Sequence, residues 1–165
     1  MKLPWVKLSA FLLLGLGAAI YLWWHLSDEQ AVLRQTDALF ETASVQRLSL
    51  GDADKPLQVF RSIIADPFIL KGSDPIPSGT YSEAEAVALL KDFRDNVGGS
   101  RIRRLETAVA FPDPDEARVE TLIEVDLSWG RGPHSVDKFK AELLFQRTPE
   151  GWILTRAAFL HRPGK

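Results

Sequence analysis

The sequence predicts an α+β protein that one N-terminal helix holds at a membrane. Three observations predict it. The chain starts with an apolar stretch of bilayer-spanning length, and apolar residues then recur at helical spacing in three segments before residue 98. From Ser100 onward the hydrophobic pattern changes to a period of two. Helices followed by a run of strands indicate a helical layer that covers one face of an antiparallel sheet of four strands or more.

The apolar stretch from Leu8 to Leu26 contains no formally charged side chain. At about 1.5 Å per residue this helix is roughly 28 Å long, close to the thickness of a bilayer's hydrocarbon core. A cleaved signal peptide would need small residues at a cleavage site, and residues 17–19 are the only candidate. Cleavage there would leave an apolar, aromatic start to the mature chain. We therefore expect residues 1–27 to be retained as a transmembrane signal-anchor.

The charges on either side of this stretch predict its orientation. Lys2 and Lys7 precede it and Asp28 and Glu29 follow it, so the positive-inside rule leaves the N-terminus in the cytoplasm. The remaining chain would then lie on the periplasmic side of a bacterial inner membrane. Aromatic side chains at the far end of the stretch are typical of the membrane interface: Tyr21, Trp23 and Trp24.

Residues 28–165 have the length of one extracytoplasmic domain. The formal net charge of −2 becomes −4 for this part, because Lys2 and Lys7 lie outside it. Nucleic-acid binding requires a clustered positive face, so no nucleic-acid partner is expected. The chain has no cysteine, which excludes disulfides, thiolate nucleophiles and thiolate metal ligands.

Three helices are predicted before the strands. Residues 28–43 form the first, which continues from the anchor. Residues 54–66 form the second, with Pro56 in its first turn and Pro67 at its end. The third begins at a capping box formed by Ser82 and Glu85 and ends before residues 98–99. Each helix has an apolar stripe: Val32, Thr36, Leu39, Phe40 and Ala43; Leu57, Phe60, Ile63 and Ile64; Val87, Leu90, Phe93 and Val97.

Four antiparallel strands are predicted over residues 104–111, 117–129, 138–146 and 151–160. Alternation puts apolar and hydroxyl side chains on the face toward the helices. That face has no Asp, Glu or His in the first three strands. Its expected members are Leu105, Thr107, Val109, Val119, Thr121, Ile123, Val125, Leu127, Trp129, Phe139, Ala141, Leu143 and Phe145.

The order of elements resembles the nuclear transport factor 2-like, or SnoaL-like, superfamily of cone-shaped α+β domains. The helix "SEAEAVALLKDF", the strand segment "DEARVETLIEV" and the closing "FQRTPEGWILTRAAF" carry the resemblance. It implies a cone whose interior binds a small molecule in some members and nothing in others. Some members are acid–base enzymes, and others are binding modules or subunits of membrane assemblies, so the fold does not determine the function.

Catalytic chemistry has little support in the sequence. An acid–base enzyme needs a buried carboxylate or imidazole that faces the cone. The predicted inward face has none, and His134 and His161 fall in a hairpin connection and beyond the last strand. The spacing of acidic and histidine residues does not match a zinc or calcium site. We therefore expect no catalytic residue, no metal and no cofactor, although an enzyme remains open.

Two surfaces are candidate binding sites. Asp37, Tyr81 and Trp129 could line the cone and bind a small hydrophobic molecule. On the outward face of the sheet, Glu120 and Lys138 belong to a charged ladder that Leu122 and Leu144 interrupt. An apolar patch with a charged rim is typical of a protein contact. The outward face is therefore a candidate site for a partner protein or for a second copy of the chain.

These observations favour a membrane-anchored, non-catalytic interaction, scaffold or assembly subunit of a bacterial membrane complex. Its expected partners are the lipid bilayer and other inner-membrane or periplasmic proteins. The alternative is a membrane-tethered enzyme or carrier that binds a small hydrophobic molecule in the cone.

Overall fold

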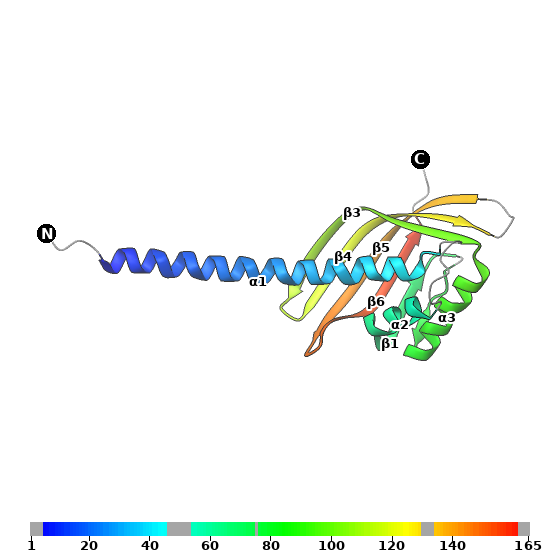
Figure 1. Ribbon diagram of the computed structural model, residues 1–165, viewed down its shortest axis with the longest axis horizontal. Helices are drawn as coiled ribbons and strands as arrows, with labels where there is room; N and C mark the ends of the chain where they lie inside the picture. The colour runs from blue at the N-terminus through cyan, green and yellow to red at the C-terminus, as the bar shows by residue number, and fades with distance from the viewer. Residues whose placement is uncertain (1–4, 46–53, 75, 130–133, 162–165) are drawn as a thin grey trace.

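The structure is a computed structural model, and it describes residues 5–45, 54–74, 76–129 and 134–161 of the chain. Within these ranges the side chains of residues 5–14, 18, 21, 22 and 24–26 are not described. The rest forms an α+β domain in which three helices lie on one face of a curved sheet, and one helix extends far beyond the sheet (Figure 1).

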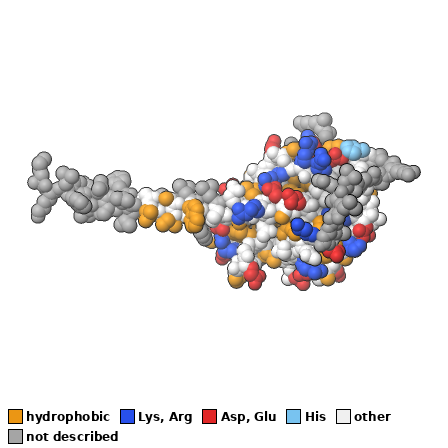
Figure 2. Space-filling model, in the orientation of Figure 1, with side chains coloured by type: hydrophobic (Ala, Val, Ile, Leu, Met, Phe, Trp, Pro, Cys, Tyr) orange, Lys and Arg blue, Asp and Glu red, His pale blue; other side chains and the backbone are white. Residues whose placement is uncertain are grey.

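Helix α1 runs from Trp5 to Ala43 without a break, so the N-terminal segment continues into the first helix of the domain. Its N-terminal half projects away from the sheet (Figure 1). Three large apolar side chains of this half face solvent, with exposed fractions of 59% for Leu16, 58% for Ile20 and 74% for Trp23 (Figure 2). Among the residues that were described, none of the helices has an apolar run of membrane-spanning length. The side chains of much of the predicted anchor, including Tyr21 and Trp24, are among those that the structure does not describe.

The C-terminal half of α1 packs on the sheet through the predicted stripe, of which Val32, Thr36, Leu39 and Phe40 are buried. Its last carbonyl groups have no partner within the helix and must be satisfied from outside. The Ser100 hydroxyl donates to the Ala43 carbonyl at 2.6 Å. The Arg94 guanidinium donates to the Thr42 carbonyl. These contacts fix the end of α1 to the neighbouring helix and strand.

Two shorter helices complete the helical layer. Helix α2 (Lys55–Ile63) has a proline in its first turn and buries Phe60 and Ile63. Helix α3 (Glu83–Asn96) starts at the predicted capping box, in which the Ser82 hydroxyl accepts from the Glu85 amide and the Glu85 carboxylate accepts from the Ser82 amide.

The sheet has six strands in the order β2-β1-β6-β5-β4-β3. The four predicted strands are present, three of them are longer than expected, and two further strands come from the segment between α2 and α3. Strand β1 pairs in parallel with β6, so the sheet is mixed, whereas the sequence predicted an antiparallel one. The bounds are β1 Ile64–Gly72, β2 Gly79–Tyr81, β3 Gly99–Asp113, β4 Glu116–Ser128, β5 His134–Thr148 and β6 Gly151–His161.

A β-bulge in β3 changes which side chains face the helices. The register shifts between Arg104, which pairs with Ile123, and Glu106, which pairs with Leu122. The extra residue, Leu105, is exposed rather than inward as predicted. Arg104 shares the inward side with Ile123, because residues paired across two strands lie on the same face. The bulge therefore brings a positive charge to the helical side of the sheet.

The core lies between the sheet and the helices and is filled by apolar side chains. The predicted inward residues of β4 and β5 are its centre: Val119, Ile123, Phe139, Ala141, Leu143 and Phe145 are all buried. Strand β6 adds Trp152, Leu154 and Ala157. The sequence shows the alternation of apolar and polar residues because one face of these strands packs in the core and the other faces solvent.

Candidate functional site

The interior of the cone offers little to a catalytic mechanism. Among the described residues, Asp28 is the only buried side chain that carries a formal charge, and the other buried polar side chains are hydroxyls. These hydroxyls bond to nearby backbone: Thr36 donates to the Val32 carbonyl at 2.9 Å and Thr121 to the Glu106 carbonyl at 2.7 Å. Their hydrogen-bonding capacity is used within the fold.

The three residues predicted to line a cavity lie in three different parts of the fold, and no described contact joins them. Asp37 is half exposed on α1, Tyr81 is half-buried at the end of β2, and Trp129 is 43% exposed after β4. Neither of two hollows in the described surface is lined by any of them. The Asp37 carboxylate lies 3.3 Å from a guanidinium nitrogen of Arg104. This pair at the edge of the interior was missed in the sequence because the bulge that turns Arg104 inward has no local signal.

The histidines and acidic residues do not form a reactive cluster. His134 is exposed and contacts Asp126 on the outer face. His161 is exposed, contacts Asp137 at 3.7 Å, and its ring meets that of Phe139 edge-on. In the part of the chain that is described, no group of three or more acidic or histidine side chains is arranged to hold a metal ion.

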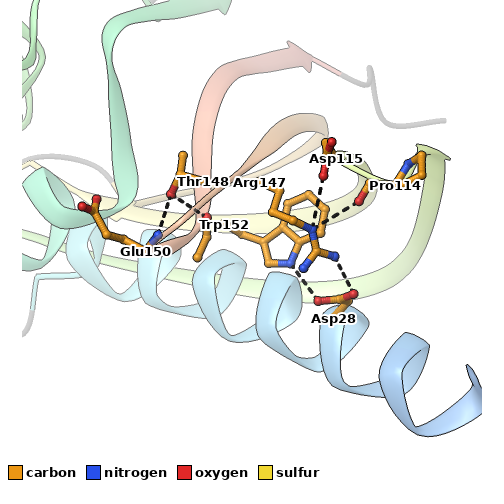
Figure 3. Close-up of polar contacts among 8 residues, drawn as sticks. Asp28, Pro114, Asp115, Arg147, Thr148, Glu150 and Trp152 are labelled. Atoms are coloured by element: carbon orange, nitrogen blue, oxygen red, sulfur yellow. Dashed lines mark hydrogen bonds and ion pairs between the residues drawn. The ribbon is translucent and has the colours of Figure 1, made fainter. Parts of the chain in front are cut away.

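Asp28 lies where α1 leaves the domain, and its carboxylate holds two elements of the sheet (Figure 3). It accepts a hydrogen bond from Arg147 Nη2 at 2.6 Å and one from Trp152 Nε1 at 3.3 Å. The Arg147 guanidinium also lies 4.5 Å from the centre of the Trp152 ring, within the range of a cation–π contact. We call these three residues the exit clasp.

The exit clasp joins three segments that are distant in the sequence. Arg147 lies near the end of β5 and Trp152 near the start of β6, so both belong to one hairpin. Gly151 between them has a φ of +128° that other residues rarely adopt. Arg147 reaches the β3–β4 turn as well, donating to the Pro114 carbonyl at 3.3 Å. Both hairpins are therefore fixed to α1 at its exit point. The sequence pattern does not predict this role for Asp28, which was interpreted only as a charge that follows the apolar stretch.

The outer face of the sheet, which points away from α1, carries the charged ladder predicted for β4 and β5. Lys140 lies 2.8 Å from Glu120 and 3.4 Å from Glu142. Glu124 pairs instead with Arg103 of β3. The hydrogen bond from Lys140 lowers the pKa of Glu120, and that from Arg103 lowers the pKa of Glu124.

The four predicted partner-binding residues all belong to this outer face, because the register alternates them with the buried positions. Leu122, Leu144 and Glu120 are partly exposed and Lys138 is exposed. Leu122 also lines an open groove of about 590 Å³ that runs over β3, β4, β5 and β6. On the outer face of the sheet, apolar side chains and charged side chains therefore lie next to each other around this groove.

No family of known sequences matches the chain. No curated protein matches it either. Solved structures do: a nuclear transport factor 2-like protein with a cystatin-like fold from Novosphingobium aromaticivorans has a TM-score of 0.67 at 16% identity, over 91% of this chain and 90% of that chain. A type 2 hexachlorocyclohexane dehydrochlorinase has a TM-score of 0.69 at 11% identity, over 84% of this chain and 87% of that chain.

A protein of unknown function with a cystatin-like fold from Nostoc punctiforme gives a TM-score of 0.62 at 12% identity, over 83% of this chain and 92% of that chain. At such identities the likeness concerns the fold alone. The resemblance drawn from the sequence is confirmed at that level: the domain has the nuclear transport factor 2-like, cystatin-like fold.

Proposed function

We propose that the chain is a non-catalytic interaction subunit of a bacterial membrane complex. In this proposal residues 1–27 anchor it in the inner membrane, and residues 28–165 form its periplasmic domain. One observation carries the proposal: α1 passes unbroken from the buried core into a segment whose described apolar side chains face solvent. Lipid would remove such side chains from water, which is favourable in proportion to the apolar area covered.

The exit clasp supports the same orientation. A helix that anchors a domain needs a firm connection at the point where it leaves the domain. Asp28, which lies two residues after the end of the predicted apolar stretch, provides this connection. With the helix in a bilayer, the β3–β4 and β5–β6 hairpins would face the membrane (Figure 1). Their formal charges are mostly negative, with Asp113, Asp115, Glu116 and Glu150 against Arg147.

The outer face of the sheet would then point sideways. Helix α1 lies along the inner face of the sheet, so the direction out of the sheet is roughly perpendicular to the helix axis (Figure 1). A membrane helix stands within a few tens of degrees of the bilayer normal. A protein anchored in the same bilayer could therefore reach the outer face laterally, and anchoring would raise its effective concentration there. A second copy of this chain meets the same condition.

The alternative is a membrane-tethered enzyme or carrier that binds a small hydrophobic molecule in the cone. One observation favours it: Arg104 Nη1 is buried and has no hydrogen-bond partner among the described residues. A ligand oxygen could accept from it beside Asp37. The dehydrochlorinase among the fold neighbours is an enzyme by name. Against this alternative, the Asp37 carboxylate is already paired and the interior beyond it is packed.

The anchor is tested by cysteine labelling, which is clean in a chain without native cysteine. Lys2→Cys and Gln58→Cys are made separately in the full chain, and intact cells are treated with a membrane-impermeant maleimide. The proposal expects labelling of Gln58→Cys only, with Lys2→Cys labelled after lysis. Equal labelling of both in intact cells, or recovery of the chain in the wash after alkaline extraction, would overturn the anchor.

The alternative is tested by native mass spectrometry of the full chain purified in mild detergent. A small molecule that co-purifies with the chain and is lost in Arg104→Met would favour the ligand-binding function. Spectra in which neither protein carries a small molecule other than membrane lipid, and in which the chain is retained together with a second membrane protein or a second copy, would favour the interaction subunit.

A further inference from the structure

A hollow of about 410 Å³ lies between α1 and the turn that joins β5 to β6, on the helical side of the sheet. Figure 3 shows this turn, with Glu150, beside the part of α1 that follows Asp28. The volume is within the range of small-molecule sites. We call this space the α1 hollow. Its wall is formed by residues 150–152 of the turn and of β6, and by Ala31, Arg34, Gln35 and Ala38 of α1.

The wall of the α1 hollow carries one cation and one anion. Arg34 is exposed on α1, and Glu150 is exposed in the turn that forms the other wall. Neither side chain forms an ion pair with another described residue, whereas the acidic groups beside them on α1 do. A hollow with one charge of each sign matches a ligand that itself carries both charges.

The other charges near the α1 hollow do not change this balance. Asp28 and Asp37 do not line it, and each is paired with an arginine of the sheet. Glu29 lies on the opposite side of α1, because it is two residues, or just over half a turn, from the first residue of the wall. Glu41 lies about 10 Å farther along α1 than Arg34. The α1 hollow is therefore neutral with two poles, and it does not suit a simple anion or a simple cation.

In the proposed function the α1 hollow lies next to the lipid headgroups. The predicted apolar stretch ends at Leu26, and Ala31 follows five residues later, about 7.5 Å along the helix. The headgroup layer of each leaflet is about 5–7 Å thick. Helical side chains lean toward the N-terminus of their helix, so the Arg34 side chain is directed toward the bilayer. The hollow therefore begins where the headgroup layer ends.

Apolar side chains of α1 lie directly below the α1 hollow. Eighteen residues make about five turns of an α-helix, so Leu16 lies on the same side of α1 as Arg34, and Ile20 on the same side as Ala38. Both Leu16 and Ile20 are exposed. An acyl chain that packs beside these two side chains would therefore place its headgroup at the hollow.

We propose that the α1 hollow binds a lipid headgroup in which a phosphodiester is joined to a primary ammonium group, as in phosphatidylethanolamine. The inference rests on the proposed function, because the anchor is what brings the hollow to the bilayer. The Arg34 guanidinium donates to two phosphate oxygens, for which its planar fork of N–H groups is suited. The Glu150 carboxylate accepts a hydrogen bond from the ammonium group, which has three N–H donors.

Two other headgroups with the same phosphodiester fit the α1 hollow less well. A choline headgroup has a cation but no N–H that could donate to Glu150. A glycerol headgroup has no cation at all. The proposal therefore predicts a preference for ethanolamine over choline and glycerol headgroups.

The test is native mass spectrometry of the full chain in mild detergent. Phosphatidylethanolamine, phosphatidylcholine and phosphatidylglycerol with the same acyl chains are added in equal amounts, and the fraction of the chain that retains each lipid is measured. Phosphatidylethanolamine should be retained about three- to tenfold more than either of the others, which corresponds to one charged contact.

Free glycerophosphoethanolamine carries the same charged groups without acyl chains. At the same concentration as the lipid it should not displace the lipid, because acyl chains beside α1 raise the effective concentration of the lipid headgroup. Displacement of the lipid would assign the α1 hollow to the free compound and overturn the lipid as its ligand.

Two pairs of variants locate the binding. Glu150→Lys should transfer the preference to phosphatidylglycerol, because two cations then face the headgroup. Its matched control is Glu41→Lys, the same change at an exposed glutamate of α1 outside the hollow. Arg34→Gln should lower the retention of phosphatidylethanolamine by about three- to tenfold. Its matched control is Arg101→Gln, at an exposed arginine of β3 outside the hollow.

The two controls should retain the three lipids in the proportions of the unmodified chain. The inference is overturned if the unmodified chain retains the three lipids equally, or if each variant changes the proportions no more than its control. Either result would leave the proposed function standing, because the labelling of Lys2→Cys and Gln58→Cys does not involve the α1 hollow. Failure of the labelling with the headgroup preference intact would overturn the anchor alone.

Discussion

Replacing Asp28 with alanine should destabilise the domain more than any other single change to a charged side chain. Asp28 is 8% exposed and accepts two hydrogen bonds, one from a cation. A hydrogen bond to a charged group contributes about 1.5–3 kcal/mol, and a buried donor left unpaired costs about 1–3 kcal/mol. The Arg147 side chain is 27% exposed, so water can replace part of its lost contact. Asp28→Ala should therefore lower the free energy of unfolding by about 3 kcal/mol.

The assay is urea denaturation of the full chain in a non-ionic detergent, followed by far-ultraviolet circular dichroism. The matched control is Glu41→Ala, which removes an exposed carboxylate from the same helix and should change the free energy of unfolding by no more than about 0.5 kcal/mol. Trp152→Phe should fall between the two, because it removes only the weaker, 3.3 Å hydrogen bond and keeps an aromatic ring under Arg147.

The reasoning is refuted if Asp28→Ala and Glu41→Ala unfold at the same urea concentration with the same slope. Such a result would mean that the exit clasp does not connect α1 to the two hairpins in solution. The account of how the domain is held at the end of its helix would then be wrong.

Three further results are expected. Phe145→Ala, at a fully buried side chain, should cost about 3–5 kcal/mol in the same urea titration. Ser82→Ala removes the hydroxyl half of the capping box with Glu85 and should cost about 1 kcal/mol, seen also as faster amide exchange in the first turn of α3. The pKa of Glu120, followed by NMR, should lie below its ordinary range and rise in Lys140→Met. Because folding lowers this pKa, the pair stabilises the fold at neutral pH and that contribution is lost as the pH falls through the folded-state pKa.

Much of the fold follows from local pattern. The capping box of Ser82 and Glu85 marks the start of α3 within one turn of sequence, and the helix begins where it predicts. Alternation in β4 and β5 predicts the buried positions from Val119 to Ile123 and from Phe139 to Phe145, because a strand with one buried face cannot shift its register by one residue. Trp129, which was also predicted to face inward, is 43% exposed. The continuity of the N-terminal segment with the first helix of the domain was predicted in the same way.

The parts that were missed depend on contacts between distant residues. Strand β1 is stabilised by parallel pairing with β6, nearly ninety residues later at Lys71 and Ala158, and its own sequence is interrupted by Pro67. The bulge at Leu105 is set by the register of β3 against β4 and has no glycine to mark it. For the site, the pattern predicted the outer-face residues Glu120 and Leu122 but not the exit clasp.

The central claim is that the chain acts by contact through its outer face while α1 holds it in a membrane. The most direct measurement is photo-crosslinking in native membranes from a photoreactive amino acid at Leu144, with Gln58 on the exposed side of α2 as the reference position. The account predicts a discrete crosslinked membrane protein, or a crosslinked dimer, from Leu144 and none from Gln58. Crosslinks of equal yield from both positions, or only the uncrosslinked monomer from Leu144, would contradict it.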